Sequence, residues 1–350
     1  MAENALTSVG VPRETKIGEH RVGLTPQVTA DLTALGVEVR VERDAGAAAG
    51  FPDAVYAGAG ARIVDVEEAF GARLVMKVKE PNPEEVARLG PEQTLFTFVH
   101  LPGNPHLQAP LEASGATVLA YELLEDELGR NPILAPMSFI AGRLASQVGA
   151  HYLEGTSGGR GVLLGAVPGT EPALAVVVGA GVVGRQAAEV AHGMGGRVLI
   201  VDNREDHARQ VASEIGPLAE AVAPNRLASV LPDASLIVGA VHRAGEAAPH
   251  VVSEAMIETM PTGSVAVDVA IDEGGCFETS RPTSHDEPTY VTHDVIHYCV
   301  PNMPSMAAHD ATVALVAATR LHIMTLVRGG IEEFRIDEGR AKAIVIEPAA

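Results

Sequence analysis

Short apolar runs alternate with amphipathic, helix-like stretches along nearly the whole chain. Helical periodicity marks residues 27–35, 138–154, 185–194 and 307–328. Apolar or alternating segments predict strands at residues 8–11, 37–41, 74–79, 95–99, 117–121, 176–178, 198–201, 236–241 and 265–270. This alternation is typical of α/β proteins whose sheets are mostly parallel.

The segment 176–184, V-V-V-G-A-G-V-V-G, predicts a dinucleotide-binding βαβ unit. Gly179 would make the tight turn, Gly181 would let a pyrophosphate approach the backbone, and Gly184 would let helix and strand pack closely. Asp202 ends the next apolar run, eighteen positions after Gly184. An acid at that distance binds the ribose hydroxyls and predicts NAD rather than NADP, although Arg204 nearby weakens that preference.

The turn-rich segments near residues 135 and 305 divide the chain into two domains. We expect residues 135–305 to form a NAD-binding Rossmann domain with a doubly wound parallel sheet. Residues 1–134 and 306–350 are expected to form a second Rossmann-like domain, which binds the substrate and carries the catalytic residues. The long predicted helices would join the two domains, as linking helices do in enzymes that close around a cleft.

Composition narrows the class of partner. The 350 residues carry a formal charge of −20, which argues against nucleic acid and anionic membrane surfaces. Two cysteines, Cys276 and Cys299, lie outside any metal-type cluster, so we expect no metal, no disulfide framework and a reducing, cytoplasmic compartment. No signal peptide is recognised, and the apolar run around the glycine motif is too short to span a bilayer.

Chemistry-bearing residues gather where predicted strands end. Lys77 and Lys79 are expected on one face of the strand 74–79, and His100 follows the strand 95–99. Asp272 lies beyond the strand 265–270, and the turn P-N-M-P ends the nucleotide domain. Each has a plain structural alternative: exposed lysines, a structural histidine or an acid that caps a turn. In α/β folds, however, strand ends are where ligands bind.

Taken in order, these motifs resemble the alanine dehydrogenase and transhydrogenase N-terminal-domain family. The resemblance runs from about Val9 to Met303, in the motifs V-P-R-E-T-K, E-H-R-V, K-V-K-E-P, F-T-F-V-H-L, L-A-P-M-S, G-G-R-G-V-L-L-G, the glycine loop, V-D-V-A-I-D-E-G-G-C-F-E and N-M-P. Transhydrogenase domains typically have asparagine where this chain has Lys79 and tryptophan where it has His100. The resemblance is therefore strongest on the dehydrogenase side.

The resemblance implies a role for each matching residue. Arg21 would bind the substrate carboxylate, Lys79 would contact the carboxylate and the carbonyl or imine, and His100 would be the general acid/base. Asp272 would orient the amine, or the attacking water and ammonia. NAD would be held by Ser138, Gly179, Gly181, Val182, Val183, Gly184, Asp202 and Val241, with Asn302 and Met303 on the nicotinamide side. Asn302 would also bind the substrate. The nicotinamide is expected to face Arg21, Lys79, His100 and Asp272 across an interdomain cleft.

The implied activity is NAD-dependent oxidative deamination of L-alanine to pyruvate and ammonia, and its reverse, by hydride transfer. The implied partners are a small amino acid or 2-oxo acid and further copies of the chain, as a hexamer or a dimer. Two alternatives stay open. One is a paralogue that acts on another amino or imino acid, and the other is a non-catalytic NAD(H)-binding protein related to the transhydrogenase domain.

The chain departs from the family pattern in four places. After N-M-P, the usual G-x-V-P-R-T-S-T is replaced by S-M-A-A-H-D-A-T at residues 305–312. Phe139 stands where glutamate is usual, residues 242–244 read H-R-A where a Leu-Val-Pro type sequence is usual, and the C-terminal segment differs. These departures put the identity of the substrate in doubt more than the chemistry.

Overall fold

The structure, a computed structural model, describes residues 5–241 and 248–348. The chain forms two compact units, Met1–Met137 with Ser305–Ala350 (unit 1), and Ser138–Pro304 (unit 2). The crossings lie inside helix α6 (Leu134–Tyr152) and inside the 3-10 helix η8 (Met303–Ala307). The boundaries expected at 134/135 and 305/306 fall within a few residues of these crossings.

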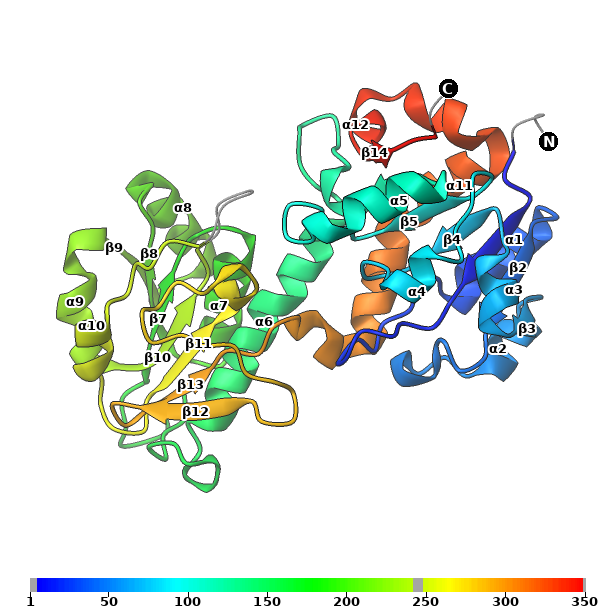
Figure 1. Cartoon of the computed structure of the whole chain (residues 1–350). Helices are drawn as coiled ribbons and strands as arrows, with labels where there is room; N and C mark the ends of the chain where they lie inside the picture. The colour runs from blue at the N-terminus through cyan, green and yellow to red at the C-terminus, as the bar shows by residue number, and fades with distance from the viewer. Residues whose placement is uncertain (1–4, 242–247, 349–350) are drawn as a thin grey trace. The chain divides into compact units, whose positions relative to one another are not determined.

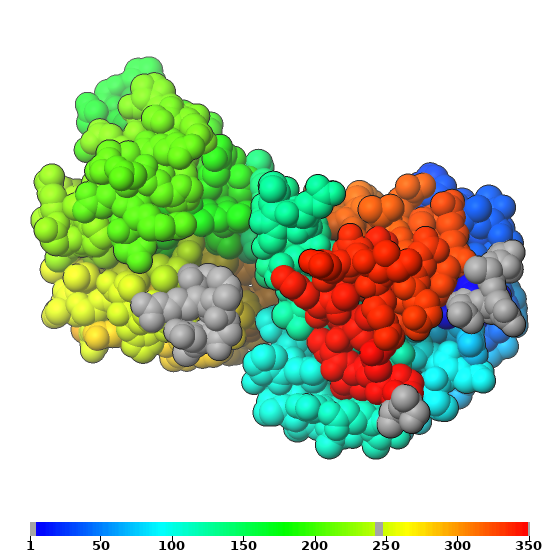
Figure 2. Space-filling model, turned by 90° about the horizontal axis from the view of Figure 1, so that it is seen from above, coloured from blue at the N-terminus to red at the C-terminus, as the bar shows by residue number. Residues whose placement is uncertain are grey.

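Among the described residues, unit 1 is built on a seven-stranded sheet of order β14-β6-β5-β4-β1-β2-β3 (Figure 1). Every neighbouring pair is parallel except β14 with β6. The strands are β1 (Ser8–Val11), β2 (Glu38–Glu42), β3 (Arg62–Val64), β4 (Leu74–Met76), β5 (Thr94–Thr97), β6 (Thr117–Ala120) and β14 (Ile344–Ile346). The last strand therefore returns the C-terminal segment to the N-terminal sheet, where Figure 2 shows it in red at the surface.

Helices lie between the strands of unit 1 along the chain. They are α1 (Pro26–Ala34), α2 (Asp53–Gly58), α3 (Val66–Phe70), α4 (Pro83–Val86), α5 (Gln108–Ser114), α11 (Ala308–Arg335) and α12 (Glu338–Ala341), with 3-10 turns η1 (Ala47–Ala49), η2 (Pro105–Leu107) and η3 (Tyr121–Leu123). Local sequence explains their ends. Thr25 caps α1 through a hydrogen bond from the Val28 N–H, with proline in the first turn, and Asn82 and Glu85 form a capping box on α4.

Unit 2 repeats the strand arrangement, with order β12-β13-β11-β10-β7-β8-β9 and one antiparallel pair, β12 with β13. Its strands are β7 (Leu174–Val178), β8 (Arg197–Val201), β9 (Ala219–Val222), β10 (Ala234–Gly239), β11 (Val265–Asp268), β12 (Thr289–Thr292) and β13 (Val295–Tyr298). The remaining elements are α7 (Val182–Gly193), α8 (Glu205–Ile215), α9 (Leu227–Val230), α10 (Glu254–Glu258), η4 (Gly155–Ser157), η5 (Pro224–Arg226), η6 (Leu231–Asp233) and η7 (Val269–Glu273).

The apolar strands of unit 2 are buried on both faces. Val177 and Ile200 belong to one hydrophobic cluster, whereas their chain neighbours Val176 and Leu199 belong to another. Successive side chains of a strand point to opposite faces, so two clusters enclose the sheet. This is why these strands are continuous β-branched runs rather than alternating patterns, as parallel sheets require.

In both sheets the strand order reverses beside the first strand. In unit 1 the reversal lies between β1 and β4, and in unit 2 between β7 and β10. The carboxyl ends of strands at such a switch point are where open α/β sheets bind ligands. The α/β class and the two Rossmann-like sheets predicted from the sequence are confirmed.

One strand prediction was wrong in a way that matters for the site. β4 ends at Met76, so Lys77 and Lys79 lie in the loop after it and do not share a strand face. The strand ends because the Glu14 carboxylate takes the Val78 and Lys79 N–H groups, which are then lost to the sheet. The short strands β3, β9, β12, β13 and β14 were not predicted.

One helical stretch, Met303–Arg335, is long and apolar enough to cross a membrane by length and composition alone. Much of this stretch is buried inside the structure, as is usual for a core helix, so its length and composition are weak evidence for a membrane span. The helix is interrupted at Gly330, whose backbone is not helical.

Candidate functional site

The glycine loop of unit 2 follows β7 and leads into α7. A Cβ on Gly179 would lie 2.4 Å from the Ala240 carbonyl oxygen, and a Cβ on Gly184 would lie 1.8 Å from the Gly179 carbonyl oxygen. Gly179 also has a φ of 107°. By contrast, no atom lies within 4 Å of a Cβ built on Gly181, the N-cap of α7. The fold therefore closes around the first and third glycines and leaves open space at the second.

Two valines and two more distant residues complete the part of unit 2 predicted to bind the dinucleotide. Val182 is 43% exposed and Val183 is half-buried, both in the first turn of α7. Val241 follows β10, the strand beside β7, and Ser138 is the first residue of unit 2, in α6. Residues 242–244, where the chain departs from the family pattern, lie outside the described residues.

Asp202 follows β8 and is tied to the glycine loop. Its carboxylate accepts hydrogen bonds from the Ala180 N–H at 2.8 Å and from the Arg204 N–H at 2.8 Å. Burial alone would raise the pKa of Asp202, but these hydrogen bonds and the Arg204 charge outweigh it and lower the pKa below its usual value. Asp202 is therefore ionised at neutral pH and repels an additional phosphate beside it.

Asp272 and Asn302 meet in unit 2. Both oxygens of the Asp272 carboxylate lie 3.2 Å from the backbone N of Asn302, which has a φ of 56°. Asp272 is exposed in η7, directly after β11, so its carboxylate is at the carboxyl edge of the sheet. The Met303 side chain is 2% exposed and packs in the core of unit 2.

The loop that carries Asp272 is fixed by Asp268, a residue that was not predicted from the sequence to belong to the site. The Asp268 carboxylate is fully buried and accepts the N–H groups of Ala270 at 3.0 Å, Cys276 at 2.7 Å and Phe277 at 3.2 Å, and the Ser280 hydroxyl at 2.5 Å. A buried carboxylate with this many donors fixes the turn on both sides of Asp272.

In unit 1, Arg21 is buried and paired with an acid two residues away. Its Nε and Nη2 donate to the Glu19 carboxylate at 2.7 and 2.6 Å, and the two side chains are 2% and 0% exposed. The pair is bidentate, the geometry in which arginine binds a carboxylate most specifically. Glu19 therefore determines the orientation of the Arg21 guanidinium.

Lys79 follows β4 and is placed through its backbone. Glu14, in the loop after β1, accepts the Val78 N–H at 2.7 Å and the Lys79 N–H at 3.3 Å. The two loops meet at the switch point between β1 and β4. The Lys79 side chain is half-buried, whereas the preceding lysine, Lys77, is completely buried.

Lys77 has a structural role. Its ammonium lies 3.2 Å from Glu14 and 3.1 Å from Glu85, and both carboxylates are buried. Burial raises the pKa of Glu14 above its usual value, since it outweighs the attraction of Lys77. Burial alone would lower the pKa of Lys77, but the two carboxylates outweigh it and raise that pKa, so the ammonium stays charged.

His100 lies three residues beyond β5 with an exposed side chain. Its backbone N–H donates to Glu122 at 2.6 Å, and its φ of 50° is in the left-handed region. That conformation is uncommon for a residue with a side chain and is held by surrounding structure. The Glu122 bond and the Gly103 and Asn104 N–H groups on the His100 carbonyl provide this support.

Arg21, Lys79 and His100 thus lie on loops that leave the same carboxyl edge of one sheet. The Glu14 bonds join the loops after β1 and β4, and His100 leaves the neighbouring strand β5. Asp272 and Asn302 meet in the other unit, at the corresponding edge of its sheet.

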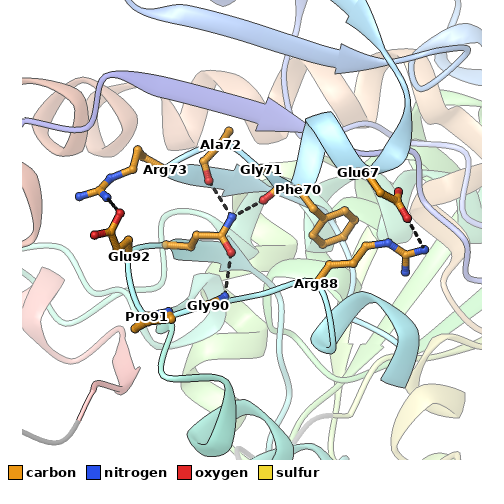
Figure 3. A pocket seen from close by; sticks show the side chains of 10 residues that line it. Glu67, Phe70, Gly71, Ala72, Arg73, Arg88, Gly90, Pro91 and Glu92 are labelled. Carbon is orange, nitrogen blue, oxygen red and sulfur yellow. Dashed lines mark hydrogen bonds and ion pairs between the residues drawn. The ribbon is translucent and has the colours of Figure 1, made fainter.

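A surface hollow of about 490 Å³ lies elsewhere (Figure 3). It is lined by the residues that precede β4 and β5, including Phe70, Arg73 and Glu92, so it sits at the amino edge of the unit 1 sheet. Ion pairs between Arg73 and Glu92 and between Arg88 and Glu67 close its rim. Because ligands bind at carboxyl edges, this hollow is not the candidate active site.

Comparisons with known proteins show which family the chain belongs to. Residues 10–141 match the family model "Alanine dehydrogenase/PNT, N-terminal domain", and residues 145–347 match "Alanine dehydrogenase/PNT, C-terminal domain". The chain belongs to the alanine dehydrogenase/PNT family.

Relatives in this family are similar over almost their full length. Alanine dehydrogenase of Halomonas elongata is 45% identical, with 94% of this chain and 90% of the relative covered, and that of Bacillus subtilis is 41% identical, with 96% and 89% covered. A solved L-alanine dehydrogenase is 41% identical with a TM-score of 0.94, covering 97% and 95% of the two chains. The transhydrogenase of Sinorhizobium meliloti, 23% identical with 97% and 99% covered, shares the fold with a TM-score of 0.88.

Membership of the family implies a nicotinamide dinucleotide, and the residues of unit 2 fit such a group. The open space at Gly181 is the position that a pyrophosphate needs, at the positive N-terminus of α7. The ionised Asp202 lies at the end of the adjacent strand, where a ribose binds. The cofactor residues predicted from the sequence stay predictions, and the Met303 side chain is buried in the core of unit 2.

Sequence reasoning missed the acids that position the site, namely Glu14, Glu19, Glu85, Glu122 and Asp268. Glu14 and Glu19 are part of the motifs that carry the resemblance, but no role was predicted for them. The sequence does not reveal these roles, because the groups that the acids bind lie at other strand ends or in turns. Only the structure shows that these acids are buried beside N–H groups or cationic side chains.

Two glycines of the loop can be compared by substitution, because an added methyl group meets open space at Gly181 and a carbonyl at Gly184. Gly181→Ala adds a methyl group to open space, so stability should change by no more than about 0.5 kcal/mol while NADH affinity falls by roughly tenfold or more. Gly184→Ala forces the methyl against a carbonyl, so it should lower the free energy of unfolding by about 1–3 kcal/mol. Urea unfolding and NADH fluorescence titration measure the two effects. Equal affinity for NADH in the Gly181→Ala variant and wild type would contradict the assignment.

Lys77 is buried with Glu14 and Glu85, so replacing it should cause a loss of stability that depends on pH. Lys77→Met leaves two buried carboxylates without their cation and should lower the free energy of unfolding by about 3–5 kcal/mol at neutral pH. Without Lys77 the pKa of Glu14 rises further, so the variant binds a proton more readily when folded. Its deficit should therefore shrink as the pH falls through that raised pKa.

The control is Lys16→Met, which removes the exposed partner of Glu80 and should cost at most about 1 kcal/mol. Urea unfolding at several pH values gives the comparison. A Lys77→Met deficit as small as that of Lys16→Met would show that the buried cluster contributes little.

Proposed function

We propose that this chain catalyses the NAD-dependent oxidation of L-alanine to pyruvate and ammonia, and the reverse reductive amination. The observation that carries this proposal is the grouping of Arg21, Lys79 and His100 on loops from one sheet edge. A guanidinium, an ammonium and a histidine are what oxidation of an α-amino acid requires. They supply a clamp for the carboxylate, polarisation of the carbonyl and proton transfer.

The Arg21 guanidinium, oriented by Glu19, would bind the substrate carboxylate and fix the position of the α-carbon. The Lys79 ammonium would contact the carboxylate and the oxygen or nitrogen on that carbon. The bound cofactor supplies the hydride acceptor for the α-carbon hydrogen. Water then adds to the resulting imine and ammonia leaves, which gives the 2-oxo acid.

His100 would take the proton released from the amine or the attacking water, and would return a proton in the reverse direction. An exposed imidazole is suited to this exchange, because its ring nitrogens can both accept and donate a proton. Asp272 would orient the amine and the attacking water or ammonia, with its carboxylate fixed by the Asn302 N–H. Ser138, the glycine loop and Val241 would hold the cofactor, with Asn302 and Met303 on its nicotinamide side.

A second candidate is the corresponding reaction on a different amino or imino acid. The observation in its favour is the segment 305–312, which differs from the family pattern while Arg21, Lys79, His100 and Asp272 are retained. A non-catalytic NAD(H)-binding role would leave these four residues without a purpose.

We also propose a cytoplasmic homo-oligomer, a hexamer or a dimer. Both cysteines are free and buried, as suits a reducing compartment. The exposed apolar side chains Val313 and Leu321, about two turns apart on α11, favour a surface that a second copy covers.

The activity is measured by following NADH oxidation with ammonia and a panel of 2-oxo acids, with pyruvate first. We expect turnover with pyruvate, and a loss of about 100-fold or more in kcat/KM for His100→Ala and Lys79→Ala, since each removes a group that acts on the substrate. Glu80→Ala, in the same loop as Lys79, is the control and should retain activity. Turnover of another oxo acid or a cyclic imine, but not of pyruvate, would support the second candidate.

The preference for NADH over NADPH is predicted separately. The ionised Asp202 carboxylate repels a 2′-phosphate, so kcat/KM with NADH should exceed that with NADPH by about 100-fold. Asp202→Ser should reduce the ratio, because it removes the repulsion and leaves Arg204 to bind the phosphate. A wild-type preference for NADPH would reject NAD as the cofactor.

A further inference from the structure

The loop that carries Arg21 is anchored at both ends by the returning C-terminal chain. The Ser305 hydroxyl donates to the Gly18 carbonyl at 2.5 Å, and the Val22 N–H donates to the Thr312 hydroxyl at 3.2 Å. Ser305 is 4% exposed and Thr312 is fully buried. All these residues belong to unit 1, and the two bonds enclose the three residues Glu19 to Arg21.

Between these anchors, the side chain of Arg21 has little freedom of its own. It is buried, and its Nε and Nη2 are bonded to the Glu19 carboxylate, which belongs to the same short segment. Glu19 and Arg21 therefore move together with the backbone of the loop. The guanidinium also lies against α6, with its Nη1 2.9 Å from the Met137 Sδ. Its position therefore depends on this contact and on where the Ser305 and Thr312 bonds hold residues 18 and 22.

Ser305 is one of the residues by which this chain departs from the family pattern. The pattern has glycine at this position, which has no hydroxyl to donate, whereas the threonine at position 312 is retained. His309, where the pattern has arginine, fixes the start of α11. Its Nδ1 lies 2.9 Å from the Ala49 carbonyl oxygen, and its ring packs on Phe51 with centroids 4.8 Å apart.

We propose that Ser305 is a positioning residue for Arg21. It determines how well the Arg21 guanidinium is placed to bind the carboxylate of a short 2-oxo or 2-amino acid. The inference rests on the proposed function, in which Arg21 binds that carboxylate. Ser305 does not touch substrate or cofactor in this proposal. It acts through the Gly18 carbonyl on the three residues that follow.

Ser305→Ala removes the hydroxyl and keeps the backbone. The KM for pyruvate should rise about 2- to 10-fold, the effect of one lost hydrogen bond, while kcat at saturation and the affinity for NADH stay within about twofold. The backbone amides of residues 19–22 should exchange with deuterium faster than in wild type. This exchange measurement reports the anchor even if the natural substrate is not pyruvate.

The matched control is Asp310→Thr, which restores the family residue at an exposed position of the same segment and should leave all these quantities unchanged. Two outcomes for Ser305→Ala overturn the proposal. One is wild-type KM and wild-type exchange. The other is an equal loss of kcat, NADH affinity and thermal stability, which indicates a general structural role. Faster exchange, together with no pyruvate turnover by wild type, would instead reject the proposed function and retain the anchor.

Discussion

Backbone N–H groups that the sheets no longer pair must find other acceptors, and in this protein carboxylates provide them. A buried N–H without a partner is costly, so every loop that leaves a strand end needs such an acceptor. Glu14 takes the N–H groups of Val78 and Lys79, and Glu122 takes that of His100. Asp202, Asp268 and Asp272 serve the same purpose in unit 2.

The same carboxylates place the residues proposed to act on substrate and cofactor. Lys79 and His100 are fixed through their backbone N–H groups, which the Glu14 and Glu122 carboxylates accept. Arg21 is the exception, because Glu19 fixes its guanidinium directly. Several of the acids behind the charge of −20 therefore have a positioning role, because they accept backbone N–H groups of the loops or orient Arg21.

Prediction from the sequence succeeded where the signal was local. The β-branched run, the glycine spacing and the acid after β8 are contained in a short segment, and their arrangement followed from backbone sterics alone. It failed at the edges of the sheets. β9 has the sequence A-E-A-V and β14 has only three residues, so neither carries enough apolar surface to be recognised without its neighbour. Lys77 was misassigned for a similar reason, since its two partners are distant in the chain or hidden in a helix cap.

The sequence by itself determined the α/β class, the glycine loop and the set of residues that resemble the family's catalytic group. Each of these depends on spacing along the chain, which periodicity and motif order reveal. Only the tertiary structure decided which charges are buried together. Glu14 lies far in sequence from Lys79, and Ser305 still farther from Gly18, so no local pattern could indicate those bonds. They form because parallel strands bring their carboxyl ends to one edge, where the unpaired backbone groups of different loops must be satisfied at the same time.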